Sequence, residues 1–431
     1  MIIPVWKGAS VITECLQALY KHCQEDLFEV ICVDNASSDN SVDLISSAFP
    51  QVRLLSQPVN LGFAGGVNAG IDAAQGDVFI LLNQDCIVQP DWIQALDRAL
   101  ATFPQYGILG SAIYRSDGSL EHTGAALRHP DAMGIHLTNH DQDDVHQTDY
   151  VTGAAFALRR STWETVGRFD EGFYPAYYED ADYCYRARRL GIETACVPSA
   201  HVKHLFSNRE WQDDPNRHAI NQHRMRYRFV CKHFQSQEMS AFFAAEILNL
   251  ESVEYLNHVL GRLIAARQIL HNLPDILERR SLDLGETIAE TTYRQLQVGF
   301  GQIMHNAYRA AERMVLPSQA DFHQAESDYQ DASIAIGSWL DQIRELSDKE
   351  HTLLAQIHFR SPSDPASRGI LRRLYRLLFK RIPSWLSGQD ERLQAELYNV
   401  RIERLNLLQR VEYALYERLK LLEILTEYDD S

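Results

Sequence analysis

The sequence has no apolar run that approaches the ~20 residues needed to cross a bilayer, and its first residues do not resemble a signal peptide. It also has no excess of positive charge. With 58 acidic and 41 basic residues, its net charge is −17, which argues against broad nucleic-acid binding. These absences predict a cytoplasmic protein whose partners are not nucleic acids.

The cysteines show neither Cys-x-x-Cys spacing nor the compact arrangement of a disulfide framework. There are seven of them: Cys15, Cys23, Cys32, Cys86, Cys184, Cys196 and Cys231. Disulfides persist mainly in oxidising compartments. We therefore expect reduced thiols, in agreement with a cytoplasmic location.

The composition, 45% apolar and 23% charged, is that of a folded protein, and 431 residues are too many for one ordinary core. The composition changes near residue 235, because all seven cysteines, 15 of the 22 glycines and 11 of the 17 histidines precede it. The remainder is rich in Leu, Glu, Arg and Gln. We expect a site-bearing domain over 1–235, a helical region over 236–360 and a further segment over 361–431.

Short apolar runs alternate with helical patterns in the first part, which is typical of an α/β fold with a mostly parallel sheet covered by helices. The expected strands are Ile2–Val5, Val30–Val33, Val52–Leu55, Val78–Leu82, Gly107–Ile113 and Ala154–Leu158. Ligands of such sheets bind outside the carboxyl ends of the strands. Since Asp34 and Asn83–Asp85 follow two of these ends, we expect a polar ligand there.

The second part has helical spacing from about residue 237, with Pro274 expected to interrupt it. Residues 368–382 hold six basic and no acidic residues beside an apolar ridge. This pattern favours either peripheral contact of 368–386 with the inner membrane face or a helix packed on its neighbours. From Asp390 onward, apolar residues recur near the period of a coiled coil, so the chain could form a homodimer or close a bundle on itself.

Four stretches of the first part concentrate polar residues at expected strand ends or loops: 34–39, 60–70, 83–85 and 177–183. The glycines of 60–70 would let the backbone approach a phosphate, but they match neither a P-loop nor Gly-x-Gly-x-x-Gly. A carboxylate in 83–85 could bind a divalent metal that neutralises a departing diphosphate. Each stretch also has an ordinary interpretation as a cap, loop or turn, and the four together indicate a site.

Three carboxylates lie within four residues at Glu179, Asp180 and Asp182. Such a cluster costs stability unless a cation or a proton-transfer role offsets the repulsion. The neighbouring tyrosines would exclude water and raise the pKa of a carboxyl group toward a value useful for a base. The alternative is a solvated start of a helix.

Taken in order, these motifs resemble the family 2 inverting glycosyltransferases of the GT-A fold, in particular their bacterial rhamnosyltransferase-like branch. The matching segments are 3–5, 33–39, 60–64, 82–85, 152–154, 167–171, 178–182 and 186–191. The resemblance covers about the first 230 residues. It implies a mixed, mostly parallel sheet with helices on both faces.

The resemblance also implies roles for individual residues. Asp180 would be the general base, and Asp85 with His204 would bind Mg²⁺ or Mn²⁺, His201 being the weaker candidate. The residues that would contact the donor are Pro4, Val5, Asp34, Asn60, Gly62, Asn83, Asp85, Gly153 and Ala154. Those that would support the site are Glu179, Asp182 and Arg186.

The sequence departs from the family pattern in two places. Asn83 stands where the first carboxylate of the metal motif is expected, which implies weaker metal binding. Met1 falls inside the expected first strand, so the native start could lie upstream. Separately, the region between the motifs contains His122, His129, His136 and His140, which we expect at the surface and which could instead meet the acceptor.

The resemblance implies a hexosyltransferase that moves a sugar from a nucleoside-diphosphate donor, dTDP-L-rhamnose or a UDP-sugar. The acceptor would be a hydroxyl of a cell-surface glycan or a lipid-linked glycan, and metal-assisted direct displacement would invert the anomeric carbon. One alternative is a non-catalytic assembly or scaffold protein, which Asn83 and the long helical part favour. A nucleotidyltransferase is the other, but Lys7 alone supplies positive charge near the first strand.

Overall fold

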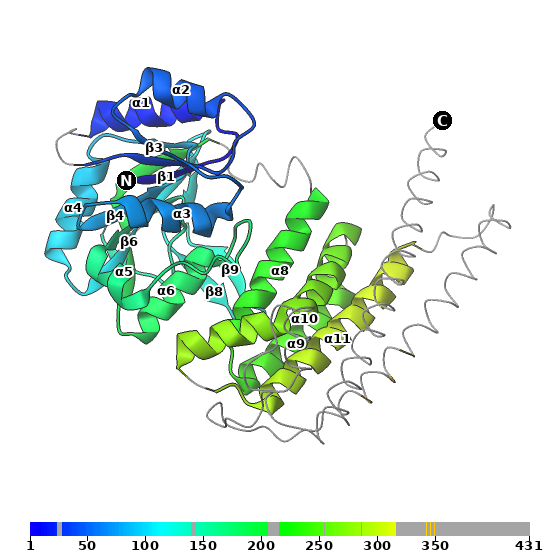
Figure 1. Cartoon of the computed structure of the whole chain (residues 1–431). Coiled ribbons are helices and arrows are strands. Elements are labelled where there is room, and N and C mark those ends of the chain that lie inside the picture. The colour runs from blue at the N-terminus through cyan, green and yellow to red at the C-terminus, as the bar shows by residue number, and fades with distance from the viewer. Residues whose placement is uncertain are drawn as a thin grey trace, which may run out of the picture. The chain divides into compact units, whose positions relative to one another are not determined.

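The structure, a computed structural model, describes residues 1–23, 28–138, 144–205, 215–253, 255–285 and 287–315, together with positions 342, 345 and 349. Two compact units divide the chain between Ala245 and Glu246 (Figure 1). The domain boundaries expected after residues 235 and 360 stay predictions, and the second of them lies outside the described residues.

The first unit is built on a mixed sheet with the strand order β10-β12-β6-β11-β4-β1-β2-β3, and β5 and β7 pair with β12 and β6. Its elements are β1 (Ile2–Val5), α1 (Ile12–His22), β2 (Ile31–Asp34), α2 (Ser41–Ala48), β3 (Arg53–Ser56), α3 (Gly62–Ala73), β4 (Val78–Leu82), β5 (Cys86–Val88), α4 (Trp92–Thr102), β6 (Tyr106–Arg115), β7 (Leu120–His122), β8 (Ala125–Arg128), β9 (Met133–His136), β10 (His146–Gln147), β11 (Ala155–Arg159), α5 (Arg160–Val166), α6 (Glu179–Arg189), β12 (Glu193–His204) and α8 (Pro215–His233). Helix α9 (Ser236–Glu251) contains the division between the units.

All six expected strands are present. Ile2–Val5 and Val78–Leu82 agree to the residue, and the other four differ by one or two residues at each end. Strands β3, β2, β1 and β4 are parallel, whereas β11 runs antiparallel to both β4 and β6. The predicted α/β fold class, with its mixed and mostly parallel sheet, is confirmed.

Helices cover both faces of this sheet, and alternation along β1 shows how. Successive side chains of a strand point to opposite faces. Ile3 and Val5 join the hydrophobic core shared with α1 and α4, whereas Ile2 faces α3. Gly70 of α3 lies so close that a Cβ there would come within 2.3 Å of Ile2 Cγ2. A side chain at position 70 would therefore push α3 off the sheet.

The directions of the strands bring several carboxyl ends to one edge of the sheet. Strands β6 and β12 are parallel to each other, and because β11 is antiparallel to both β4 and β6, they point the same way as β1, β2 and β4. This edge collects Asp34 after β2, Asn83–Asp85 after β4, His204 at the end of β12, and Gly153 and Ala154 before β11. Ligands of α/β sheets bind at such an edge.

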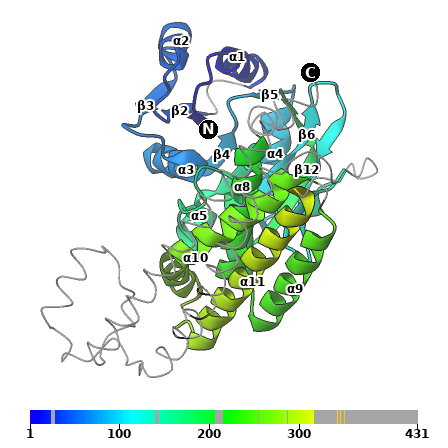
Figure 2. The same cartoon turned by 90° about the vertical axis from the view of Figure 1, so that its right-hand side faces the viewer.

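The second unit is mainly helical over its described residues 246–315, as expected. Helix α10 (Leu256–Leu284) packs along α11 (Glu290–Val315), and Figure 2 shows the two side by side. Val259, Leu273, Leu296 and Phe300 are buried in this unit. A buried ion pair joins Arg262 Nε to Glu246 Oε2 at 3.3 Å.

The expected interruption at Pro274 is wrong, because α10 continues through it. A proline inside a helix removes one backbone hydrogen bond and costs about 3 kcal/mol. The neighbouring Leu273, Ile276 and Leu277 are at most 1% exposed. Burial of three large apolar side chains, at about 1.5–3 kcal/mol each, outweighs the cost of the proline.

Two expectations fall on residues that the structure does not describe. These are the basic segment 368–386, with its membrane contact, and the coiled-coil pattern from Asp390, with its homodimer. Both stay predictions. Among the residues that the structure describes, no helix combines the length and the apolar character needed to span a bilayer.

Candidate active site

Asp34 ends β2 beside the end of β1. Its side chain is buried, and Oδ1 accepts a hydrogen bond from the Ser37 N–H at 3.0 Å. Pro4 and Val5 lie in parallel register beside the end of β2. The loop after β1 is tied to the same turn, because the Lys7 N–H donates to Ser37 Oγ at 3.0 Å. Three of the predicted donor-binding residues are thus adjacent.

Asn60 and Gly62 lie at the start of α3, next to the turn that follows β2. The Gly62 N–H donates to Asn60 Oδ1 at 2.8 Å, and Asn35 Nδ2 donates to the Gly62 carbonyl at 3.1 Å. Gly62 has a φ of +71°, and a Cβ there would lie 2.8 Å from the Pro175 carbonyl oxygen. Only glycine suits this position.

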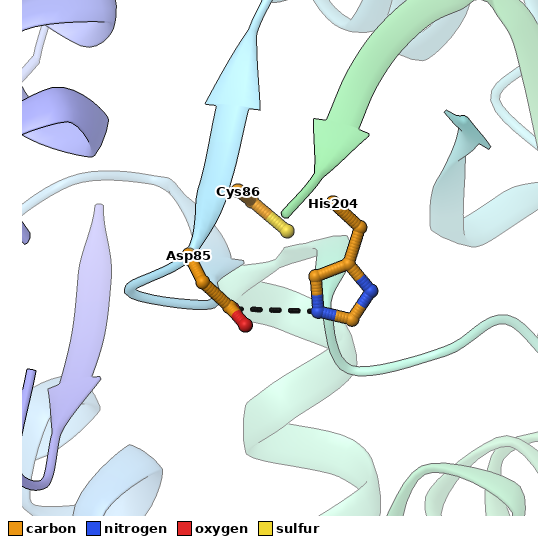
Figure 3. Close-up of side chains that lie close together, drawn as sticks. All are labelled: Asp85, Cys86 and His204. Atoms are coloured by element: carbon orange, nitrogen blue, oxygen red, sulfur yellow. Dashed lines mark ion pairs between the residues drawn. The ribbon is translucent and has the colours of Figure 1, made fainter. Parts of the chain in front are cut away.

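Asp85 and His204 come together from different strands. His204 Nε2 lies 3.3 Å from Asp85 Oδ1 (Figure 3). On the other side of the ring, His204 Nδ1 lies 3.8 Å from Glu121 Oε2. Burial alone would lower the pKa of His204, but the two carboxylates outweigh it and raise this pKa to about 9. The surroundings of the imidazole are therefore strongly negative, which favours a cation.

The side chains at this point fit a divalent metal ion. The ligand atoms of Asp85, Cys86 and His204 all lie within 4.8 Å of one another, and carboxylate and imidazole are common metal ligands. Glu121 Oε2 is buried and has no hydrogen-bond partner. By contrast, the ring of His201 packs against Tyr114, with centroids 5.5 Å apart, and is exposed.

Gln84 clamps the end of β1 to the turn between β4 and β5. Its Oε1 accepts a hydrogen bond from the Trp6 N–H at 3.1 Å, and its Nε2 donates to the Trp6 carbonyl at 3.0 Å. The side-chain amide thus satisfies both backbone groups of Trp6. It holds the loop near Asp34 against the turn that bears Asp85.

Replacing Gln84 by Leu should weaken nucleotide binding by about 3–10-fold without unfolding the protein. Each hydrogen bond contributes about 0.5–1.5 kcal/mol, and water can replace part of both because the clamp is exposed. Calorimetric titration with nucleotide measures the effect. The control is Gln51→Leu, which changes an exposed residue just before the amino end of β3. Equal nucleotide affinities of Gln84→Leu and Gln51→Leu would contradict this role of Gln84.

Asp180 is connected by hydrogen bonds to the turn that bears Asp85. Its Oδ2 accepts from the Gly153 N–H at 3.1 Å, and the Asn83 N–H donates to the Ala154 carbonyl at 2.9 Å. Asp180 is half-buried. Burial raises the pKa of its carboxyl group, opposed by hydrogen bonds from the N–H groups of Gly153 and Ala181. A raised pKa is what a general base needs near neutral pH.

The chain enters α6 through two residues with left-handed backbone conformations, Tyr177 (φ 82°) and Tyr178 (φ 67°). Such positions cost about 1–3 kcal/mol each for side chains other than glycine and cluster at functional sites. The Tyr178 hydroxyl donates to the Ala132 carbonyl at 2.8 Å, which helps to hold this entry. The next residue, Glu179, is buried, and burial together with the charge of Asp180 raises its pKa well above the usual range.

Asp182 and Arg186 tie α6 to α8. Asp182 Oδ2 accepts a hydrogen bond from Arg186 Nε at 2.9 Å, and its Oδ1 accepts from Lys232 Nζ and from His233 Nε2. Lys232 also donates to Asp170 at 2.8 Å. Burial alone would raise the pKa of Asp182, but Lys232 and Arg186 outweigh it and hold this pKa well below the usual range. Asp182, supported by Arg186, therefore holds α6 against α8.

The histidines between the motifs differ in their surroundings. The surface interpretation is wrong for His122, which is fully buried with its ring edge against His136 at 4.8 Å between centroids. His136 is exposed over part of its surface, and the packing around its ring lowers its pKa, against the opposing charges of Asp180 and Glu121. His129 is exposed and stacks on Phe234 at 5.6 Å. His140 lies outside the described residues.

Residues 1–166 match the model of the family described as glycosyl transferase family 2. The match includes the strand ends at Asp34, Asn83–Asp85 and Gly153. It ends before α6, so Asp180 and His204 lie beyond the matched residues.

Two relatives illustrate the range of similar sequences. The uncharacterised protein y4gI of Sinorhizobium fredii is 25% identical over 234 residues, which cover 51% of this chain and 26% of the relative. An N-acetylglucosaminyl-diphospho-decaprenol L-rhamnosyltransferase of Mycobacterium tuberculosis is 29% identical over 228 residues, covering 47% of this chain and 74% of the relative. The chain thus spans about a quarter of the first relative and about three quarters of the second.

Among solved structures, GalNAc-T7 with UDP, GalNAc and Mn²⁺ is similar with a TM-score of 0.47 and 17% identity, covering 57% of this chain and 50% of that one. TarS 1–349 of S. aureus in complex with UDP-GlcNAc is similar with a TM-score of 0.45 and 12% identity. It covers 75% of this chain and 93% of that one.

Proposed function

The N-terminal domain of this chain belongs to glycosyl transferase family 2, and from this premise we propose that the protein is an inverting hexosyltransferase. It takes a sugar from a nucleoside-diphosphate donor and transfers it to a hydroxyl group of an acceptor. One observation carries the proposal: the metal-binding turn at Asn83–Asp85 and the carboxylate of Asp180 are linked by hydrogen bonds through Ala154 and Gly153.

The donor side of the site combines the two clusters at the carboxyl edge of the sheet. Asp34 accepts hydrogen bonds from the base or ribose of the nucleotide, and the backbone of Pro4 and Val5 lies beside it. Asp85 and His204 would hold Mg²⁺ or Mn²⁺, which when bound stabilises negative charge on the diphosphate. We expect the metal ion to bind more weakly than it would beside two carboxylates, because Asn83 supplies none.

Asp180 acts on the acceptor side as general base. Its carboxylate takes the proton of the acceptor hydroxyl while the oxygen forms a bond to the anomeric carbon. The bond from that carbon to the diphosphate oxygen breaks on the opposite face, so the configuration inverts and a nucleoside diphosphate leaves. Glu179, whose raised pKa favours the protonated form, adds no second negative charge beside the base.

The proposed sugar and acceptor come from the relative that is matched over the larger share of its own length, 74% against 26%. The Mycobacterium tuberculosis relative is a rhamnosyltransferase acting on a decaprenol-linked diphosphate sugar, as its name states. We propose dTDP-L-rhamnose as the donor, with UDP-sugars as the second choice, and a glycan, free or lipid-linked, as the acceptor. We propose that His136, an exposed residue of β9, contacts that acceptor.

Calorimetric titration with dTDP, UDP and GDP, each with and without Mn²⁺, tests the donor site. We expect one nucleotide to bind in the presence of Mn²⁺. Asp85→Ala should weaken this binding more than about 10-fold, because it removes a carboxylate that would hold the metal ion, whose charge would stabilise the diphosphate. Asp97→Ala, at an exposed position of α4, should bind like the wild type.

The other outcomes decide between functions. If the folded protein binds no nucleotide, the enzyme proposal fails and the scaffold interpretation replaces it. Tight binding of a nucleoside triphosphate in preference to every diphosphate would indicate a nucleotidyltransferase instead.

A further inference from the structure

Cys86 adds a thiol to the candidate metal site, which the proposed function does not use. It is the first residue of β5 and stands directly opposite His204 of β12 in the antiparallel register. Side chains of directly opposed residues lie on the same face with their Cβ atoms about 4.5–5.5 Å apart. The register of β5 and β12 therefore places the sulfur beside the imidazole.

The three side chains point toward one another (Figure 3). The carboxylate of Asp85 faces the ring of His204, and the sulfur of Cys86 also points toward that ring. The candidate ligand atoms are within 4.8 Å of one another. Since zinc bonds to such atoms are about 2.0–2.3 Å long, the three side chains must move closer together to share one ion.

The combination of one sulfur, one nitrogen and one oxygen differs from the ligands that Mg²⁺ prefers. Magnesium selects oxygen ligands, whereas thiolate and imidazole favour zinc and similar softer ions. Zn²⁺ also binds a given site more tightly than Mn²⁺ in the general order of affinities.

We infer that this site binds a thiophilic divalent ion, Zn²⁺ in the first place, with Asp85, Cys86 and His204 as its three protein ligands. On binding, the Cys86 thiol and Nε2 of the His204 imidazolium each release a proton to solvent as the sulfur–metal and nitrogen–metal bonds form. The inference deepens the proposed function and rests on it for the role of the site. The thiol makes zinc a competitor of the Mg²⁺ or Mn²⁺ that supports donor binding.

Glu121 supplies an independent indication of a cation. Its side chain is 11% exposed, and Oε2 has no hydrogen-bond partner although it faces His204 Nδ1 at 3.8 Å. A histidine that binds a metal through one nitrogen usually donates its other N–H to a carboxylate. Glu121 is placed to orient His204 in this way.

Co²⁺ can be used in place of Zn²⁺ to test the site, because a cobalt ion bound to a thiolate absorbs light. Addition of Co²⁺ to the full chain should produce a near-ultraviolet thiolate-to-cobalt charge-transfer band, and Zn²⁺ should abolish it by displacement. Cys86→Ala should lose the band. Its affinity for Zn²⁺ should also fall by more than about 100-fold. Loss of a residue that only hydrogen-bonds a metal ligand costs about 10–100-fold, and loss of a ligand should cost more. Cys15→Ala is the matched control, because Cys15 is an equally buried thiol near Cys86, and it should keep the band.

X-ray absorption of the zinc-loaded wild type provides a test that needs no variant. A sulfur scatterer at about 2.3 Å, beside nitrogen and oxygen at about 2.0–2.2 Å, is the expected result. Absence of sulfur from the zinc shell, or a cobalt band that survives in Cys86→Ala, would overturn the inference. If Mn²⁺-dependent nucleotide binding occurs without a thiolate–metal signal, the proposed function stands and the zinc site fails. If the thiolate–metal signal appears but no nucleotide binds, the zinc site stands and the proposed function fails.

Discussion

Replacing Asp180 by Asn should lower kcat by about 10²–10⁴-fold, the usual contribution of a general base. The amide keeps the shape of the side chain and can still accept the hydrogen bond from the Gly153 N–H, but it cannot take the proton of an acceptor hydroxyl. Nucleotide binding should change little, because Asp180 stands on the acceptor side. Release of nucleoside diphosphate in the presence of acceptor, combined with calorimetry, separates the two effects.

The pH profile gives a second readout for Asp180. Because burial raises the pKa of this carboxyl group, it takes up a proton at a higher pH than an exposed aspartate does. Turnover should therefore fall as the pH drops through this raised pKa, and the residual activity of Asp180→Asn should not follow that fall. Asp97→Asn is the control at an exposed position. Near-normal turnover by a folded Asp180→Asn would remove Asp180 from the mechanism.

Replacing Lys232 by Met should destabilise the first unit by about 3 kcal/mol. Lys232 is fully buried and donates to both Asp170 and Asp182, and removing one partner of a buried ion pair costs about 3–5 kcal/mol because it leaves an uncompensated charge. Arg186 and His233 still contact Asp182, which favours the lower end of that range. Urea unfolding and hydrogen exchange in α6 and α8 measure the loss.

His233 reports on the same change. Burial lowers the pKa of His233 to about 4 against the opposing effect of Asp182, and the charge of Lys232 is part of this lowering. Without Lys232 this pKa should rise, which NMR titration of the imidazole can follow. Lys21→Met, at an exposed position of α1, should stay within about 0.5 kcal/mol of the wild type. Equal stabilities of Lys232→Met and Lys21→Met would show that the buried ion pairs of Lys232 do not hold α6 in place.

The strands could be predicted closely from the sequence. The run Val78–Leu82 is apolar at every position and bounded by polar residues, and a strand buried on both faces of a parallel sheet has that pattern. Pro274 could not be predicted from its local effect alone. Its helix persists because neighbouring apolar side chains are buried in the second unit, and burial is decided by residues far along the chain.

The candidate site could be predicted only in part. Asp34 and Asp85 are predictable because they follow strands, and the ends of parallel strands share one edge of the sheet. Glu121, Cys86 and Gln84 are not. Glu121 belongs to a three-residue strand without a recognisable pattern, and Cys86 and Gln84 matter through partners on β12 and after β1.

The sequence by itself determined the order of the strands along the chain, the polar residues at their ends and the acidic cluster at 179–182, because periodicity and turn chemistry act over a few residues. Only the tertiary structure decided the different roles within that cluster. Asp180 and Asp182 are two positions apart on a helix, so they project about 200° apart around its axis. Asp180 consequently reaches Gly153 at the edge of the sheet, whereas Asp182 reaches Lys232 in α8. Those partners are 27 and 50 residues away in sequence, and only the packing of the sheet and helices brings them within hydrogen-bond distance.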